Sequence, residues 1–166
     1  MIADSRTSVA FTGHRTYRGA AADALRRTVG ELYALGFRTF LSGMAVGFDL
    51  AAAEAVLELR ERVPGVRLVA AVPFRGQEMR FSPADRERFR CVLAEADSVE
   101  VLAPAYHRGC YAVRNDFLVD NARVLVAWYD GSPGGTHYTV RRAMRRGLEI
   151  LDLHPAASAL PAFAPT

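Results

Sequence analysis

Short apolar runs alternate with stripes of helical periodicity along almost the whole chain. Runs rich in β-branched and other apolar residues predict strands at 8–12, 38–42, 66–72, 98–102, 123–127 and 149–153. Apolar residues spaced three or four apart predict helices at 20–35, 48–59, 83–96, 111–121 and 136–146. Nearly continuous apolar strands separated by helices are typical of a mainly parallel sheet that is covered on both faces. We therefore expect an α/β, Rossmann-like, doubly wound fold.

The length and composition agree with one domain. The chain has 166 residues, of which 51% are hydrophobic and 23% are charged, as in an ordinary globular protein. We place the domain at 1–154 and expect the Pro- and Ala-rich residues 155–166 to form a flexible, frayed tail. No apolar run approaches the roughly 20 residues of a membrane span, and the first residues do not resemble a signal peptide. We expect a cytoplasmic protein without membrane contact.

Arginine supplies all 21 basic residues, so the sequence contains no lysine. This excludes chemistry that depends on a lysine Schiff base, a Walker A lysine or a Ser–Lys dyad. A formal net charge of +3 and a pI near 9.2 permit an anionic ligand without requiring a nucleic acid. The four histidines are scattered without the spacing of metal ligands, so we expect no protein-bound metal.

Three of the predicted strands end in glycine-containing turns, at 12–15, 42–49 and 128–139. In a doubly wound fold, ligands bind beyond the carboxyl ends of the strands. Glycine lets the backbone turn sharply or approach a ligand closely, and the second and third turns also lead into helix N-termini, which attract anions. Together the turns predict a phosphate-binding edge. Its candidate ligand-binding residues are Thr12, Gly13, His14, Arg15, Ser42, Gly43, Met44, Ala45, Gly47, Asp49, Gly134, Gly135 and Thr136.

Several side chains at this edge allow two interpretations. Asp49 lies in the first turn of a predicted helix, where capping of the helix N-terminus or a favourable interaction with it is favoured over a contact to a ribose hydroxyl. Thr136 is expected both to cap a helix and to donate to phosphate. Arg114, on the helix before the fifth strand, is expected at the rim of a cleft, where a guanidinium pairs with phosphate in a bidentate manner. Trp128 and Tyr129 either pack in the core, which is the favoured interpretation, or stack on a base.

These residues resemble the SLOG superfamily of Rossmann-like nucleotide-binding proteins, and within it the YpsA-like family. The resemblance rests on "SGMAVGFDLAAAEAV", "VPFRGQE", "VRNDFLVDNARVLVAWYDG" and the following "GGT", and it extends from "FTGHR" to "GLEIL". It implies a nucleotide or nucleotide-derived ligand along the strand ends. The LONELY GUY phosphoribohydrolases of this superfamily carry PGGxGTxxE and an arginine on the preceding helix. Residues 133–136 resemble a shortened form of that motif and Arg114 matches the arginine, but Thr139 replaces the glutamate.

The missing glutamate favours a binding protein or sensor over an enzyme. Without it, a nucleoside-monophosphate phosphoribohydrolase would have to use Asp130 or Glu78 beside Arg114. We therefore expect an AMP-like or ADP-ribose-like ligand, with no further cofactor required. The chain also resembles the DNA-processing protein A family, whose SLOG domain binds single-stranded DNA, but the sequence carries no basic track interleaved with aromatics. Nucleic acid is therefore not the expected partner, and a homodimer is the expected assembly.

Overall fold

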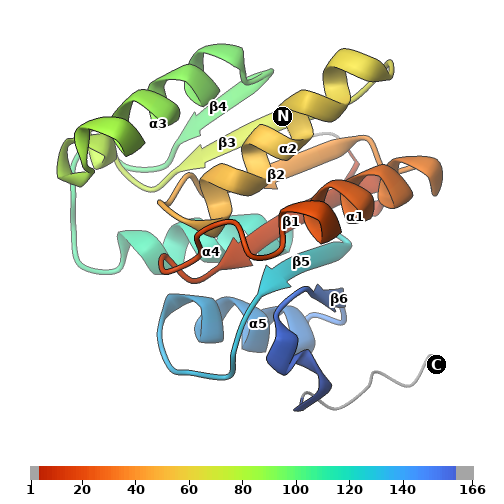
Figure 1. The fold of residues 1–166 in the computed structure, drawn as a ribbon. Helices are drawn as coiled ribbons and strands as arrows, with labels where there is room; N and C mark the ends of the chain where they lie inside the picture. Colours follow the sequence, from red (N-terminus) through yellow and green to blue (C-terminus); the bar gives the residue numbers. More distant parts are fainter. Residues whose placement is uncertain (1–3, 160–166) are drawn as a thin grey trace.

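The computed structural model describes residues 4–159, and in this range six strands form one all-parallel sheet (Figure 1). The strand order is β4-β3-β2-β1-β5-β6, and every neighbouring pair is parallel. The strands are β1 (Ser8–Gly13), β2 (Thr39–Ser42), β3 (Arg67–Val72), β4 (Ser98–Val101), β5 (Val124–Trp128) and β6 (Glu149–Asp152). The predicted sheet is therefore confirmed.

Helices cover both faces of this sheet. One face carries α1 (Ala22–Ala34), α2 (Phe48–Arg62) and α3 (Pro83–Glu95), whereas the other carries α4 (Cys110–Asp120) and α5 (Gly135–Arg145). Short 3-10 helices add η1 (Ser5–Thr7), η2 (Gln77–Arg80) and η3 (Pro155–Ala159). This arrangement confirms the Rossmann-like, doubly wound fold class. Within residues 4–159, none of the helices is both long and apolar enough to cross a membrane.

The side chains of the central strands alternate between two hydrophobic cores. In β1, Val9 and Phe11 pack on the side of α1, α2 and α3, whereas Ala10 packs on the side of α4 and α5. In β5, Val126 and Leu125 divide between the two sides in the same way. Successive side chains of a strand point to opposite faces, so a strand that is buried on both faces has to be apolar throughout. This explains the unbroken apolar runs in the sequence.

The boundaries of the elements lie close to their predicted positions. The apolar stripe of α2 runs to 59, and the helix itself continues to Arg62, just before the Pro64-Gly65 stop. The start of α3 follows the usual capping pattern, since Ser82 Oγ accepts the Asp85 N–H at 3.2 Å and Pro83 is the first helical residue. Three short helices were not predicted: η1, η2, and η3 at the place where a frayed tail was expected. The rest of that predicted tail, 160–166, lies outside the described residues.

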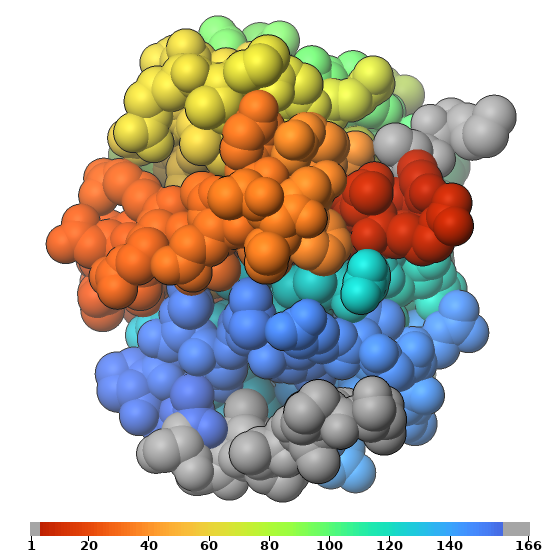
Figure 2. Space-filling model, turned by 90° about the vertical axis from the view of Figure 1, so that its right-hand side faces the viewer, coloured from red at the N-terminus to blue at the C-terminus, as the bar shows by residue number. Residues whose placement is uncertain are grey.

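The order in which successive strands are added to the sheet reverses at β1, in the middle of the sheet. From β1 the chain builds β2, β3 and β4 toward one edge, and then crosses through α4 so that β5 pairs with the other side of β1. The register places Gly13 beside Trp128, so the carboxyl ends of β1 and β5 are adjacent (Figure 1, toward the left). Figure 2, turned by 90° so that the right-hand side of Figure 1 faces the viewer, shows the chain segments from yellow and green at the top to blue at the bottom. Such a switch point is where doubly wound folds bind ligands.

Candidate functional site

A cavity of about 540 Å³ lies at the carboxyl ends of β1 and β5, and we call it the switch-point cavity. Its walls come from the turn after β1, the loop before α2, one side of α4 and the N-terminus of α5. This volume is within the range of small-molecule sites. The lining residues are Thr12, Gly13, His14, Arg15, Thr16, Ala45, Asp49, Tyr111, Arg114, Asn115, Asp130, Ser132, Gly135 and Thr136.

Arg114 forms the floor of the switch-point cavity instead of its predicted rim. The side chain is buried; its Nη1 donates to the Gly43 carbonyl oxygen and its Nε donates to Asn115 Oδ1 at 2.7 Å. A Cβ atom on Gly43 would lie 2.8 Å from Arg114 Cδ. The Arg114 side chain can therefore pack against residue 43 only because that residue is a glycine. Burial lowers the pKa of Arg114, and the charge of Asp49 opposes this effect.

Asp49 is a buried carboxylate in the wall of the same cavity. It lies in the first turn of α2, but Oδ2 accepts the N–H of Ala45 at 3.3 Å, in the loop before the helix. Asp49 therefore does not cap α2 by a hydrogen bond to a helical N–H, but its position in the first turn agrees with the expected favourable interaction with the helix N-terminus. Burial raises the pKa of Asp49 to about 6, and the positive charges of Arg114 and Arg15 act in the opposite direction.

His14 and Asp130 join the ends of β1 and β5 across the top of the cavity. His14 Nε2 lies 2.8 Å from Asp130 Oδ1 and 3.2 Å from the backbone nitrogen of Asp130. When Nε2 is unprotonated it accepts the backbone N–H of Asp130, and when it carries a proton it donates to the Asp130 carboxylate. Hydrogen bonds from the hydroxyl and backbone N–H of Ser132, together with His14, lower the pKa of Asp130 to about 2. Asp130 is therefore an ionised group at the cavity mouth near neutral pH.

The N-terminus of α5 opens onto the cavity through Gly135 and Thr136. The preceding Gly134 has φ 138° and ψ −163°, a conformation that essentially only glycine adopts. The Tyr138 N–H donates to the Gly134 carbonyl oxygen at 3.0 Å, so the N–H groups before it precede the first helical hydrogen bond. Thr136 lines the cavity, but the predicted cap is wrong, because within 4–159 no side chain caps α5. These N–H groups and the helix dipole favour an anion.

The second glycine turn contributes less to the cavity than predicted. Gly47 has φ 83°, and a Cβ atom there would lie 2.7 Å from the Arg15 carbonyl oxygen, so the turn after β1 covers the start of α2. Ser42 is buried, donates to the Asp49 carbonyl oxygen and accepts the Met44 N–H. Met44 is itself fully buried in the core. Only Ala45 and Asp49 of this turn reach the cavity.

The structure brings together eight of the thirteen predicted ligand-binding residues, and five stay outside the cavity lining. The residues outside are Ser42, Gly43, Met44, Gly47 and Gly134. Of the three conditional catalytic residues, Arg114 and Asp130 line the cavity, whereas Glu78 lies in η2 away from it. Trp128 and Tyr129 lie outside it as well. Tyr129 is buried, as the favoured core interpretation predicted, and Trp128 is half-buried.

Four lining residues were not predicted from the sequence, namely Thr16, Tyr111, Asn115 and Ser132. Helical periodicity carried a signal for two of them. Tyr111 lies three residues before Arg114, and Asn115 lies four residues after Tyr111, so all three share one side of α4. Once Arg114 was a candidate, its helical neighbours were candidates too.

Two arginines flank a pair of aromatic rings beside the cavity. The Arg15 guanidinium lies 5.4 Å from the centre of the Tyr111 ring, and Arg80 lies 4.5 Å from the Tyr106 ring. The Tyr106 and Tyr111 rings are 6.3 Å apart, so the two pairs are neighbours. The sequence carried no such track because the folded chain assembles it from segments that are separated in sequence. We call Arg15, Tyr111, Tyr106 and Arg80 the arginine–aromatic edge.

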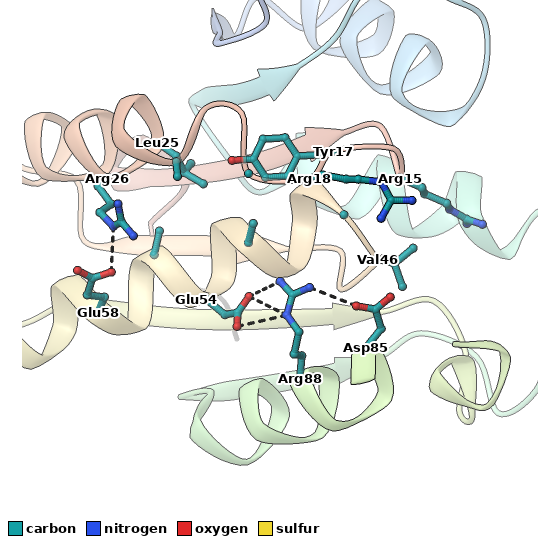
Figure 3. A pocket seen from close by; sticks show the side chains of 15 residues that line it. Arg15, Tyr17, Arg18, Leu25, Arg26, Val46, Glu54, Glu58, Asp85 and Arg88 are labelled. Atoms are coloured by element: carbon teal, nitrogen blue, oxygen red, sulfur yellow. Dashed lines mark hydrogen bonds and ion pairs between the residues drawn. The ribbon is translucent and has the colours of Figure 1, made fainter. Parts of the chain in front are cut away.

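A larger hollow of about 670 Å³ lies between α1, α2 and α3 and the turn after β1 (Figure 3). Most of the charged side chains that cross it are paired with one another: Arg88 contacts Glu54 and Asp85, and Arg26 contacts Glu58. Charged side chains that already pair with one another at a surface are less available to bind a charged ligand. The switch-point cavity is the better candidate for a ligand site, because it combines an open helix N-terminus with a buried guanidinium and a buried carboxylate.

Comparison with protein families places most of this chain in one family model. Residues 10–150 match the YpsA model, which is described as the YspA SLOG family. A UPF0398 protein of Bacillus cereus (strain G9842) is similar to this chain, with 26% identity over 160 residues that cover 88% of this chain and 86% of the relative. The match thus includes every strand from β1 to β6 at least in part.

Two solved structures of DNA processing protein A are similar to this fold. The protein from Streptococcus pneumoniae matches with a TM-score of 0.63 and 20% identity over 87% of this chain. The protein from Helicobacter pylori, described for its single-stranded DNA binding mode, matches with a TM-score of 0.62 and 17% identity over 88% of this chain. The match covers 49% of the first protein and 64% of the second. At these identities, the likeness concerns the fold alone.

Proposed function

Given that this chain belongs to the YspA SLOG family, we propose that its switch-point cavity binds a nucleotide or a nucleotide-derived phosphate ligand. An AMP-like or ADP-ribose-like molecule is the expected ligand, with no further cofactor, and the protein would act as a sensor or regulatory binding protein. Phosphate would lie at the N-terminus of α5, against the N–H groups of Gly135 and Thr136. Arg15 from the turn after β1 would supply charge to it.

The single observation that carries this proposal is the open N-terminus of α5 beside buried, charged groups. Gly135 and Thr136 line the cavity together with Arg114 and Asn115, and a Cβ atom on Gly135 would lie 3.8 Å from Asn115 Nδ2. A helix N-terminus alone is weak support, because many helices begin at the surface. Here the N-terminus ends in a cavity whose floor holds a buried guanidinium, which matches a phosphate in charge.

The proposal predicts that AMP or ADP-ribose raises the melting temperature of the protein. At a ligand concentration of 100 times Kd, binding stabilises the folded state by about 2.7 kcal/mol, which corresponds to roughly 5–10 °C for a chain of this size. Gly135→Asp should weaken this shift strongly, because its carboxylate would lie where phosphate binds. We expect at least about a tenfold loss of affinity.

Gly135→Asn is the matched control, because it adds a side chain of the same shape without the charge. Neither variant should lose stability through a clash, since the neighbouring Asn115 Nδ2 is at ordinary contact distance. The Asn variant should retain more of the nucleotide-dependent shift than the Asp variant. Equal loss in both variants would indicate steric blocking, and an unchanged melting temperature of the native protein across a broad nucleotide set would contradict the proposal.

Binding of single-stranded DNA is a second candidate, and the arginine–aromatic edge favours it. Aromatic rings together with cationic side chains are the usual means of holding single strands, and the solved structure from Helicobacter pylori is described for its single-stranded DNA binding mode. The test is titration of an oligonucleotide at increasing salt, because phosphate contacts make such binding strongly salt-dependent. We favour the mononucleotide, since two charged groups of the cavity, Arg114 and Asp49, are buried rather than arranged along an open groove.

A phosphoribohydrolase activity is the third candidate, and it would have to use Asp130. Thr139 occupies the position of the glutamate in the related motif, is buried and donates to the Gly135 carbonyl oxygen at 2.9 Å. Glu78 lies outside the cavity lining. We therefore expect AMP to remain intact after long incubation, and release of adenine that stops in Arg114→Ala would overturn this expectation. The expected homodimer stays a prediction that analytical ultracentrifugation can test.

A further inference from the structure

Asp49 has one carboxylate oxygen that the fold leaves unused. The residue is 5% exposed and lines the switch-point cavity. Its Oδ2 accepts the Ala45 N–H, whereas Oδ1 is buried and accepts no hydrogen bond from any residue in 4–159. A buried carboxylate oxygen without a donor costs free energy, because it has lost its water. A ligand that brings a donor to this oxygen would recover that cost.

The neighbours of Asp49 restrict the chemistry of that donor. Arg114 and Arg15 are the positive charges that act on Asp49, so a cationic donor would be repelled by the groups beside it. A neutral donor, such as a hydroxyl group, meets no such repulsion. Hydroxyl groups also form strong hydrogen bonds to an ionised carboxylate.

The order of groups along the cavity floor restricts which part of the ligand reaches Asp49. Gly135, at the proposed phosphate position, faces Asn115, which accepts from Arg114 at 2.7 Å. Arg114 in turn contacts Gly43, in the same turn that leads to Asp49. The carboxylate is thus removed from the helix N-terminus by the two side chains of α4. In a nucleoside phosphate, the group next to the phosphate is the sugar, and its hydroxyls are neutral donors.

Resting on the proposed function, we propose that Asp49 accepts hydrogen bonds from the ribose hydroxyl groups of the ligand and thereby selects ribonucleotides over deoxyribonucleotides. A site built to bind a hydroxyl discriminates against the analogue without it, because the buried acceptor is then left unpaired. This selection would also disfavour DNA in the cavity. Asp49 would then determine whether the cavity binds ribonucleotides or deoxyribonucleotides.

Titration of the native protein with AMP, 2′-deoxy-AMP and 3′-deoxy-AMP by calorimetry tests this inference directly. Loss of the hydroxyl that Asp49 binds should weaken affinity roughly 10- to 100-fold, the range for hydrogen bonds to charged groups. Asp49→Asn should bind AMP about as weakly as the native protein binds the weaker deoxynucleotide. In Asp49→Asn, the ratio of the affinity for AMP to the affinity for that deoxynucleotide should fall toward one.

Asp85→Asn is the matched control, because Asp85 lies on α3 away from the cavity and pairs with Arg88 at 3.2 Å. Asp85→Asn should show the same ratio of AMP to deoxynucleotide affinity as the native protein. Equal affinity of the native protein for all three nucleotides would overturn this inference and leave nucleotide binding intact. Binding of none of them would overturn the proposed function together with it. The native titrations decide the question even if Asp49→Asn does not fold.

Discussion

At the scale of a single residue, the buried carboxylate of Asp49 lowers the stability of the ligand-free protein. Its Oδ1 is buried without a donor among the residues of the described range, and the carboxylate is charged near neutral pH. Burial raises the pKa to about 6 from 3.8, so the ionised form is less favourable in the folded state than in the unfolded state. The ligand-free protein therefore carries a cost that a hydroxyl-bearing ligand would offset.

This cost has a definite dependence on pH. Below about pH 4, Asp49 is protonated in both states and costs nothing; between pH 4 and 6 the unfolded state loses its proton first, so stability falls as pH rises. Asp49→Asn should therefore raise the free energy of unfolding of the ligand-free protein above pH 6, by about 2–3 kcal/mol. Its Oδ1 can still accept the Ala45 N–H.

Denaturant unfolding at pH 7.5 and pH 4 measures this difference, with Asp85→Asn as the control at a half-buried carboxylate paired with Arg88. The gain for Asp49→Asn should be present at pH 7.5 and nearly absent at pH 4. A gain of the same size at both values would assign the effect to packing instead of charge. A loss of stability at pH 7.5 would mean that the ionised carboxylate is already well satisfied in the ligand-free protein.

At the scale of elements, glycine controls how closely the strand ends and helices approach. Gly13 ends β1 against Phe48, the first residue of α2, and a Cβ atom there would lie 2.5 Å from the Phe48 side chain. Gly43 does the same for Arg114 of α4. These glycines set distances between elements, which is why the turn that holds Gly43 and Gly47 contributes so little backbone to the cavity.

Two glycine-to-alanine substitutions separate this packing role from backbone flexibility. Gly13→Ala should destabilise the protein by about 1–3 kcal/mol, because the added methyl group overlaps a fully buried ring. Gly30→Ala, in the middle of α1, meets no atom within 4 Å among the described residues and should stabilise by about 0.5–1 kcal/mol. Urea unfolding curves of both variants give the comparison, and shifts of equal sign would contradict it.

At the scale of the whole molecule, the sequence predicted the fold well and the site in part. The fold follows from local patterns, because strands buried on both faces are apolar throughout and helices show their stripes. The cavity depends on contacts such as that of Arg114 with Gly43, which are 71 positions apart and leave no local pattern. For the same reason the arginine–aromatic edge was missed, and η2 carries Glu78 away from the cavity.

The single crossing from β4 to α4 divides the polypeptide into two successive segments that meet along β1 and β5. Arg15 and Asp49 belong to the first segment, whereas Arg114 and Gly135 belong to the second. A cut in the exposed stretch 104–109 would leave only non-covalent contacts to hold the two halves of the cavity together. A nucleotide that contacts both halves would then act as a molecular glue, and reassembly of the severed protein would report the presence of its ligand.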